Sequence, residues 1–119
     1  NKVFFLGPRD DVASFMKSAD LLVHPAREEA AGNIIIEAMV SGLPSIVSKE
    51  VGFASEVENF NAGEVLHDLF SQDEFNQVLE ETIQDERLSI IKKEISCLGD
   101  DDYFFSRFRF IADLIEERF

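Results

Sequence analysis

The sequence predicts an α/β fold in which a parallel sheet is flanked by helices. Residues 21–24 and 45–48 are short apolar runs of the kind found in parallel strands that are covered on both faces. Residues 33–41 lie between them, carry mostly apolar side chains and end at Gly42, a common residue just after a helix. The order strand, helix, strand therefore indicates a Rossmann-like sheet, and 119 residues are enough for one globular domain.

Two elements are expected before residue 21. Residues 3–6 form an apolar run that ends at Gly7 and is interpreted as an interior strand. Asp10 or Asp11 is then placed to cap a short helix that lies against the sheet. Its apolar residues recur at helical spacing and are Val12, Phe15, Met16 and Ala19.

The segment at residues 33–41 allows two interpretations. Its three consecutive residues Ile34, Ile35 and Ile36 are β-branched and favour a strand. The following Glu37-Ala38-Met39 and the stop at Gly42 favour a helix, which is the interpretation adopted.

The second half of the chain predicts one strand and three helices. A short strand at residues 64–66 follows a turn at 61–63, and amphipathic patterns follow at residues 73–83 and 88–98. After a break at residues 100–102, an aromatic helix carries apolar side chains on two adjoining stripes. We expect a fragment with this helix either to self-associate through it or to fold it back onto the sheet.

Composition excludes several classes of partner. The net charge of −13 disfavours binding to nucleic acid or to an anionic membrane surface. The single Cys97 allows no internal disulfide, and with only His24 and His67 beside it there is no cluster at metal-ligand spacing. No apolar run approaches the roughly 20 residues that span a bilayer. We expect a cytoplasmic protein, with any contact to the inner face of the membrane made by a further domain.

The candidate site is the loop that joins the strand at 21–24 to the next helix. It holds two carboxylates, Glu29 and Glu37, on either side of small residues. Parallel sheets bind ligands at the carboxyl ends of their strands, where helix N-termini present free N–H groups to anions. Gly32 and Asn33 are placed to supply the first amides of the helix, and Glu37 falls about one turn further on.

Three short motifs carry a resemblance to a known family. Glu29-Ala30-Ala31-Gly32, Glu37-Ala38-Met39 and Gly42-Leu43-Pro44 resemble the E-x7-E signature of retaining, nucleotide-sugar-dependent glycosyltransferases with the two-domain GT-B fold. The usual form is Glu-Gly-Phe-Gly, so Ala30 and Ala31 depart from it. Together with His24-Pro25 and Val51-Gly52-Phe53-Ala54, the motifs are most similar to the lipopolysaccharide core glucosyltransferase I branch.

The resemblance implies an organisation for the whole enzyme. Residues 1–119 are expected to be a single fragment from the later part of the C-terminal, donor-binding domain of a GT-B fold, with residues 100–119 as its C-terminal return helix. The partner is then the N-terminal, acceptor-binding domain of the same full-length chain. Because that domain holds the acceptor site, the fragment alone is expected to be inactive.

The resemblance also implies a reaction and a set of site residues. The enzyme is expected to transfer glucose or a similar hexose from a UDP-sugar to a lipopolysaccharide-core-type acceptor, with the donor as substrate and neither a cofactor nor a metal. Glu29 is the catalytic residue and faces the donor sugar. Gly32, Asn33 and Ile34 bind the diphosphate through their amides, and Glu37 accepts hydrogen bonds from the ribose hydroxyls.

The two carboxylates and several nearby residues also allow other interpretations. Two carboxylates also occur in retaining glycosidases, but there they lie only about 5 Å apart, which the intervening loop and helix turn oppose. For His24, contact with the donor and simple packing at the strand end are about equally favoured. His67 and Cys97 are interpreted as structural. Arg27 is interpreted as solvated rather than bound to phosphate, and Phe53 stands where the family often has glycine near the sugar.

Two other functions remain open at this point. One is a non-catalytic α/β module that binds a nucleotide-sugar or regulates another protein. The other is an epimerase with the same GT-B architecture.

Overall fold

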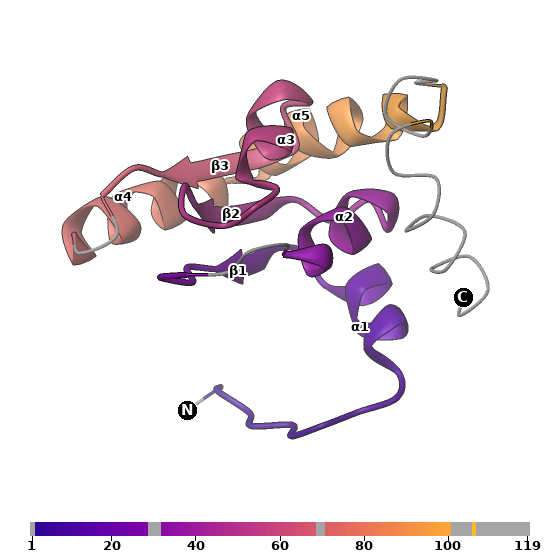
Figure 1. Cartoon of the computed structure of the whole chain (residues 1–119), viewed down its shortest axis with the longest axis horizontal. Coiled ribbons are helices and arrows are strands. Elements are labelled where there is room, and N and C mark those ends of the chain that lie inside the picture. Colours follow the sequence, from indigo (N-terminus) through magenta and orange to yellow (C-terminus); the bar gives the residue numbers. More distant parts are fainter. Residues whose placement is uncertain (1, 29–31, 69–70, 101–105, 107–119) are drawn as a thin grey trace.

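The sheet has three parallel strands, as seen in the computed structural model, which describes residues 2–28, 32–68, 71–100 and 106. These strands are β1 (Leu22–His24), β2 (Ser45–Ser48) and β3 (Gly63–Leu66), in the order β1-β2-β3. Val23 pairs with Ile46, and Ile46 with Glu64, so the carboxyl ends of all three strands lie at one edge. Figure 1 shows the strands running in the same direction.

Helices connect the strands and cover the sheet (Figure 1). They are α1 (Val12–Ser18), α2 (Asn33–Val40), α3 (Ala54–Asn59), α4 (Gln72–Thr82) and α5 (Asp85–Ser96), followed by the 3₁₀ turn η1 (Cys97–Asp100). The predicted α/β fold with a parallel sheet flanked by helices is confirmed. β2 begins and ends where the sequence predicts, and the described β1, β3, α2, α4 and α5 agree closely with their predicted segments.

Helix α2 contributes four buried apolar residues to the fold. Ile35, Ile36, Ala38 and Met39 are almost completely inaccessible to solvent. The helical interpretation of Ile34-Ile35-Ile36 is therefore confirmed, and the reason is energetic. Burying each of two isoleucines stabilises the fold by about 1.5–3 kcal/mol, which exceeds the few tenths that β-branching costs in a helix.

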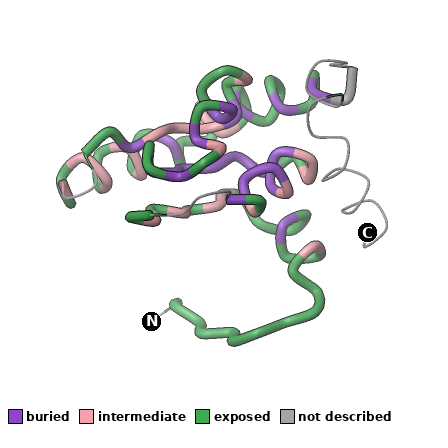
Figure 2. The backbone as a smooth tube through the Cα atoms, viewed as in Figure 1, coloured by how far each residue is buried: buried purple, intermediate pink, exposed green. Residues whose placement is uncertain are grey.

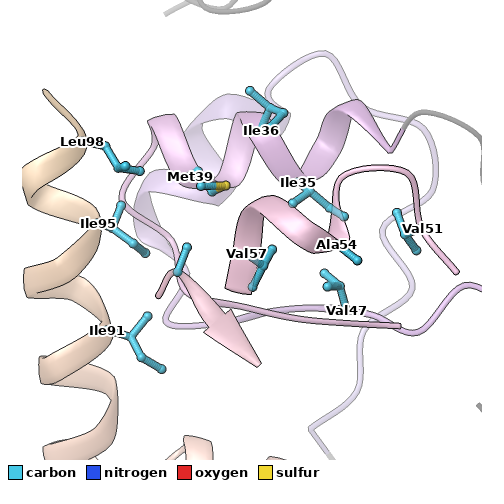
Figure 3. Close-up of a cluster of buried hydrophobic side chains, with 11 residues drawn as sticks. Ile35, Ile36, Met39, Val47, Val51, Ala54, Val57, Ile91, Ile95 and Leu98 are labelled. Carbon is cyan, nitrogen blue, oxygen red and sulfur yellow. The ribbon is translucent and has the colours of Figure 1, made fainter. Parts of the chain in front are cut away.

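The main core lies where α2, α3 and α5 meet the sheet (Figure 3). Ile35 points from α2 towards Ala54 of α3 and Val47 of β2. Ile91 and Ile95 of α5 enter the same cluster from the side, at positions four residues apart on one helical face. Arg87 of α5 also hydrogen-bonds to Glu64 of β3, a partly exposed pair that adds little to stability but orients the helix.

Helix α1 is held to the rest of the fold mainly by Met16, which packs with Ala38 and Leu43. Asp11 occupies the predicted N-cap position, but its carboxylate makes no capping bond and accepts two hydrogen bonds from Arg9 instead, at 2.7 and 3.0 Å. This hydrogen bonding to Arg9 lowers the pKa of Asp11.

The predicted strand at residues 3–6 is wrong. These residues pair with no strand in the described part of the chain, and Phe5 is 97% exposed. Figure 2 shows the whole segment before α1 as exposed. The expected two-sided cover of β1 is also wrong, because Val23 is 38% exposed. Among the described strands, β1 pairs with β2 alone, so its other edge has no described strand neighbour.

Two further differences concern short or late segments. Helix α3 was not predicted, because its six residues contain too little periodicity to stand out. The predicted aromatic helix at residues 100–119 lies outside the described residues, except for Asp100 and Ser106. The self-association predicted for it therefore stays a prediction. No helix in the described ranges is long and apolar enough to cross a membrane.

Replacing Ile91 with Ala should test whether α5 docks on the core as described. Ile91 is 1% exposed, so the substitution should lower the free energy of unfolding by about 2–5 kcal/mol through lost burial and a cavity. Its neighbour Ile90 is 53% exposed, and Ile90→Ala should change stability by less than about 0.5 kcal/mol. Urea unfolding followed by circular dichroism measures both; equal losses would contradict this packing.

Candidate active site

The site is built around the N-terminus of α2. Gly32 is its N-cap residue and adopts a left-handed conformation, with φ 64° and ψ 43°. The N–H of Ile35 donates to the carbonyl of Gly32 at 2.9 Å and so makes the first bond of the helix. The amides of Asn33 and Ile34 precede that bond and have no helical acceptor. Since neither donates to a described backbone acceptor, both can donate to a ligand.

Gly32 is buried under the loop that follows β2. A Cβ atom at this position would lie 2.5 Å from Cγ1 of Val51, which is itself buried, and 4.0 Å from the backbone nitrogen of Gly52. Together with the positive φ, this contact explains why a glycine stands here. The β2 loop and the start of α2 are consequently held against each other.

The loop that follows β1 is anchored to β2. The hydroxyl of Ser48, at the end of β2, donates a hydrogen bond to the carbonyl of Ala26. Ser48 is completely buried, so this bond is shielded from water. It fixes the chain just after β1, from which the segment with Glu29 leads to Gly32.

Glu37 lies on α2 one turn beyond Asn33 and is half-buried. Residues four apart share a helix face, and side chains tilt towards the helix N-terminus, so the Glu37 carboxylate is directed back along the face that begins at Asn33. It forms no hydrogen bond or ion pair with another described residue. Glu37 therefore presents an acceptor-only group on the helix face that begins at Asn33.

The local electrostatics suit an anion even though the chain is acidic. The first turn of α2 contains no acidic residue, so nothing there opposes the partial positive charge of the helix N-terminus. The arrangement can hold phosphate oxygens at the amides and hydroxyl groups at Glu37. Within the described ranges, no group of three His, Cys, Asp or Glu side chains could hold a metal ion.

The structure places most of the other residues considered from sequence. Glu29 lies outside the described residues, so its role stays a prediction. His24 ends β1 and is half-buried, and Phe53 packs against the main core. Arg27 is exposed and lines a pocket with Asp68.

His67 and Cys97 both lie on the surface. The Nε2 atom of His67 is 3.3 Å from a carboxylate oxygen of Glu58, and Cys97 contacts the carbonyl of Lys93. Ser48 and Val51 hold the site together. Val51 was noted from sequence only as part of the Val51-Gly52-Phe53-Ala54 motif, and Ser48 was not identified as a site residue. Their roles follow from the folded contacts with Ala26 and Gly32.

Comparisons with known proteins show similarity to glycosyl transferases. Residues 1–95 match the family described as Glycosyl transferases group 1. The chain is 40% identical over 83 residues to the lipopolysaccharide glucosyltransferase WaaG of Escherichia coli K12, covering 70% of this chain and 22% of that one. It is 34% identical over 92 residues to the Escherichia coli UDP-Gal:alpha-D-GlcNAc-diphosphoundecaprenol alpha-1,3-galactosyltransferase, covering 77% and 24%.

The fold is similar to a solved structure. The crystal structure of WaaG, a glycosyltransferase involved in lipopolysaccharide biosynthesis, matches with a TM-score of 0.81 and 34% identity. The match covers 95% of this chain and 31% of that one. The chain thus spans about a quarter of the length of the curated relatives it matches.

Replacing Gly32 with Ala should destabilise the site region for two separable reasons. The left-handed backbone costs about 1–2 kcal/mol for an L-residue, and the clash with Val51 adds about 1–3 kcal/mol. Gly42 also has a positive φ, of 79°, but a Cβ there meets nothing within 4 Å, so Gly42→Ala should show the backbone cost alone.

The double variant Gly32→Ala/Val51→Ala isolates the clash. Its loss in unfolding free energy should be smaller than the sum of the two single losses, because Val51→Ala removes the atom that the new Cβ meets. Additive losses in a denaturant titration would show that Val51 does not confine position 32.

Proposed function

The chain belongs to the family of group 1 glycosyl transferases, and on that basis we propose that it forms the donor-binding half of a retaining glycosyltransferase. The enzyme transfers glucose or a similar hexose from a UDP-sugar to a lipopolysaccharide-core-type acceptor. The observation that carries this proposal is the N-terminus of α2, where the amides of Asn33 and Ile34 precede the first helical bond and the carboxylate of Glu37, one turn further on, has no partner among the described residues.

The diphosphate of the donor binds at the start of α2. Gly32, Asn33 and Ile34 supply the backbone amides there, and the helix dipole adds a favourable field. Gly32 contributes through its left-handed backbone, while the space that a side chain would fill at this position is taken by Val51. Since the whole chain carries a net charge of −13, specific amide donors are needed to offset the unfavourable long-range field.

The ribose of the nucleotide binds at Glu37. A carboxylate has two acceptor oxygens, so two neighbouring hydroxyl groups can donate to it together. Glu37 lies about 6 Å along the helix from Asn33, given a rise of about 1.5 Å per residue. That separation allows one nucleotide to reach both the amides and the carboxylate.

Glu29 acts on the reacting sugar. In the sequence it stands three residues before Gly32. We assign it the role of orienting the donor or stabilising oxocarbenium-like charge, while the leaving diphosphate takes the proton of the acceptor hydroxyl on the same face. The anomeric carbon–oxygen bond to phosphate breaks as the bond to the acceptor oxygen forms, which retains the configuration.

The names of the relatives support the proposed donor and acceptor class, and their lengths support a second domain in the complete enzyme. One relative is named as a lipopolysaccharide glucosyltransferase and another as acting on a UDP-sugar. Both are several times longer than this chain. We therefore assign acceptor binding mainly to an N-terminal domain of the complete enzyme, which works in the cytoplasm at the inner face of the membrane.

Glu37→Ala should weaken binding of UDP by about 1.5–3 kcal/mol, the usual loss for hydrogen bonds to a charged group. Glu50→Ala is the matched control, because it removes the same charge from the exposed loop after β2. Calorimetric titration with UDP measures both variants. Equal affinities for the Glu37 variant and the unmodified protein would exclude Glu37 from the donor site.

Glu29→Gln in the complete enzyme should lower kcat on the order of 100-fold while leaving UDP affinity nearly unchanged, because its charge acts in the transition state. The adjacent exposed Glu28 provides the control, and Glu28→Gln should leave both quantities unaltered. Initial rates of hexose transfer decide the outcome. A variant that retains turnover within a few-fold of the unmodified enzyme would remove the catalytic assignment of Glu29.

A further inference from the structure

A second pocket lies at the same edge of the sheet as the donor site but does not include α2. It has a volume of about 350 Å³ and is formed by residues that follow β1, residues at the end of β3 and the first turn of α4. Its apolar wall consists of Pro25, Leu66 and Phe75. This volume is at the small end of the range for ligand pockets, about 300–1,000 Å³.

The polar part of the pocket combines opposite charges with neutral groups. Arg27 and Asp68 contribute one positive and one negative side chain, and Ser71 and Gln72 contribute a hydroxyl and an amide. The lining therefore carries no net charge, within a chain whose overall field repels anions. Such a lining suits a neutral ligand with several hydroxyl groups, each of which can both donate and accept.

The α4 side of the pocket is held in one conformation by hydrogen bonds. The Glu74 carboxylate accepts bonds from the backbone N–H groups of His67 and Asp68, at 3.1 and 2.7 Å. The hydroxyl oxygen of Ser71 accepts from the Glu74 N–H at 3.0 Å, and the Phe75 N–H donates to the Ser71 carbonyl at 3.1 Å. These bonds fix Asp68, Ser71 and Phe75 relative to one another, which reduces the entropy lost when a ligand binds.

The β1 side is fixed independently. The bond from Ser48 to the Ala26 carbonyl holds the residue between Pro25 and Arg27 against the buried strand β2. The same β1 loop continues to Gly32, so one short segment connects this pocket with the proposed diphosphate position. A ligand here would lie at the carboxyl edge of the sheet, beside the donor.

From this arrangement we propose that the pocket binds one neutral sugar ring of the saccharide acceptor, while the N-terminal domain holds the rest of that acceptor. The apolar C–H face of the ring packs on Phe75 and Pro25, and its hydroxyl groups exchange hydrogen bonds with Asp68, Ser71 and Gln72. The pocket as a sugar site stands on its own geometry. Its assignment to the acceptor rests on the proposed transferase function.

Titration with methyl α-D-glucopyranoside, followed by amide chemical shifts, tests sugar binding without turnover. The sugar should shift the amides of Asp68, Ser71 and Phe75 and leave those of Asn33 and Ile34 unchanged. Phe75→Ala should weaken its affinity about tenfold, because one aromatic contact is lost. Phe5→Ala removes an exposed phenylalanine outside the pocket and should have no effect.

A second pair of variants tests the pocket without removing the partly buried Phe75, whose loss could impair folding. Gln72 and Gln77 are both exposed on α4, but only Gln72 lines the pocket. Gln72→Ala should weaken binding of the methyl glucoside at least severalfold, and Gln77→Ala should not. Equal affinities for these two variants, or no shifts at the pocket amides with unmodified protein, would overturn the sugar site.

Two further titrations separate this proposal from its alternatives and from the donor site. Inorganic phosphate should not reproduce the shifts caused by the methyl glucoside; if it does, the pocket is an anion site and the proposal is wrong. Saturating UDP should leave methyl glucoside affinity unchanged, and competition would overturn the acceptor assignment. If UDP fails to bind while the sugar binds, the proposed function fails and the sugar pocket stands.

Discussion

The burial of helix α2 is the constraint on which the rest of the structure depends. Ile35, Ile36 and Met39 can leave water only if α3, α5 and β2 surround them, and the connections between these elements then allow little freedom. With α2 fixed, its first residue must meet the loop after β2. Gly32 fulfils this requirement because it accepts a left-handed backbone and leaves space for Val51. The packing of the core thus determines the position of the site.

The same constraint explains how a strongly acidic chain can hold a diphosphate. The binding groups are backbone amides, whose direction is fixed by the buried helix, and no acidic side chain stands in the first turn of α2. Glu37 is far enough along the helix to meet hydroxyl groups rather than phosphate. Stability and ligand binding therefore use different groups of one element: its apolar side chains face the core, and the backbone amides of its N-terminus are offered to the ligand.

Much of this fold could be predicted because the relevant signals are local. Residues 45–48 form a strand as expected, and the pattern from Asp73 to Leu98 gives two amphipathic helices. What could not be predicted depends on contacts distant in sequence. Residues 3–6 are exposed and pair with no described strand, and Phe53 packs against the main core cluster. The site motif was visible as Gly32 and Glu37, whereas Ser48 and Val51 became visible only through their contacts with Ala26 and position 32.

The most direct test of the central claim is the response of individual backbone amides to UDP. In a titration followed by ¹⁵N–¹H correlation spectra, binding at the start of α2 predicts the largest shifts at the amides of Gly32, Asn33 and Ile34. The amides of α5, which packs on the core away from the carboxyl edge of the sheet, should stay unchanged. Shifts of similar size throughout the chain, or none at these three residues at saturating UDP, would contradict the account.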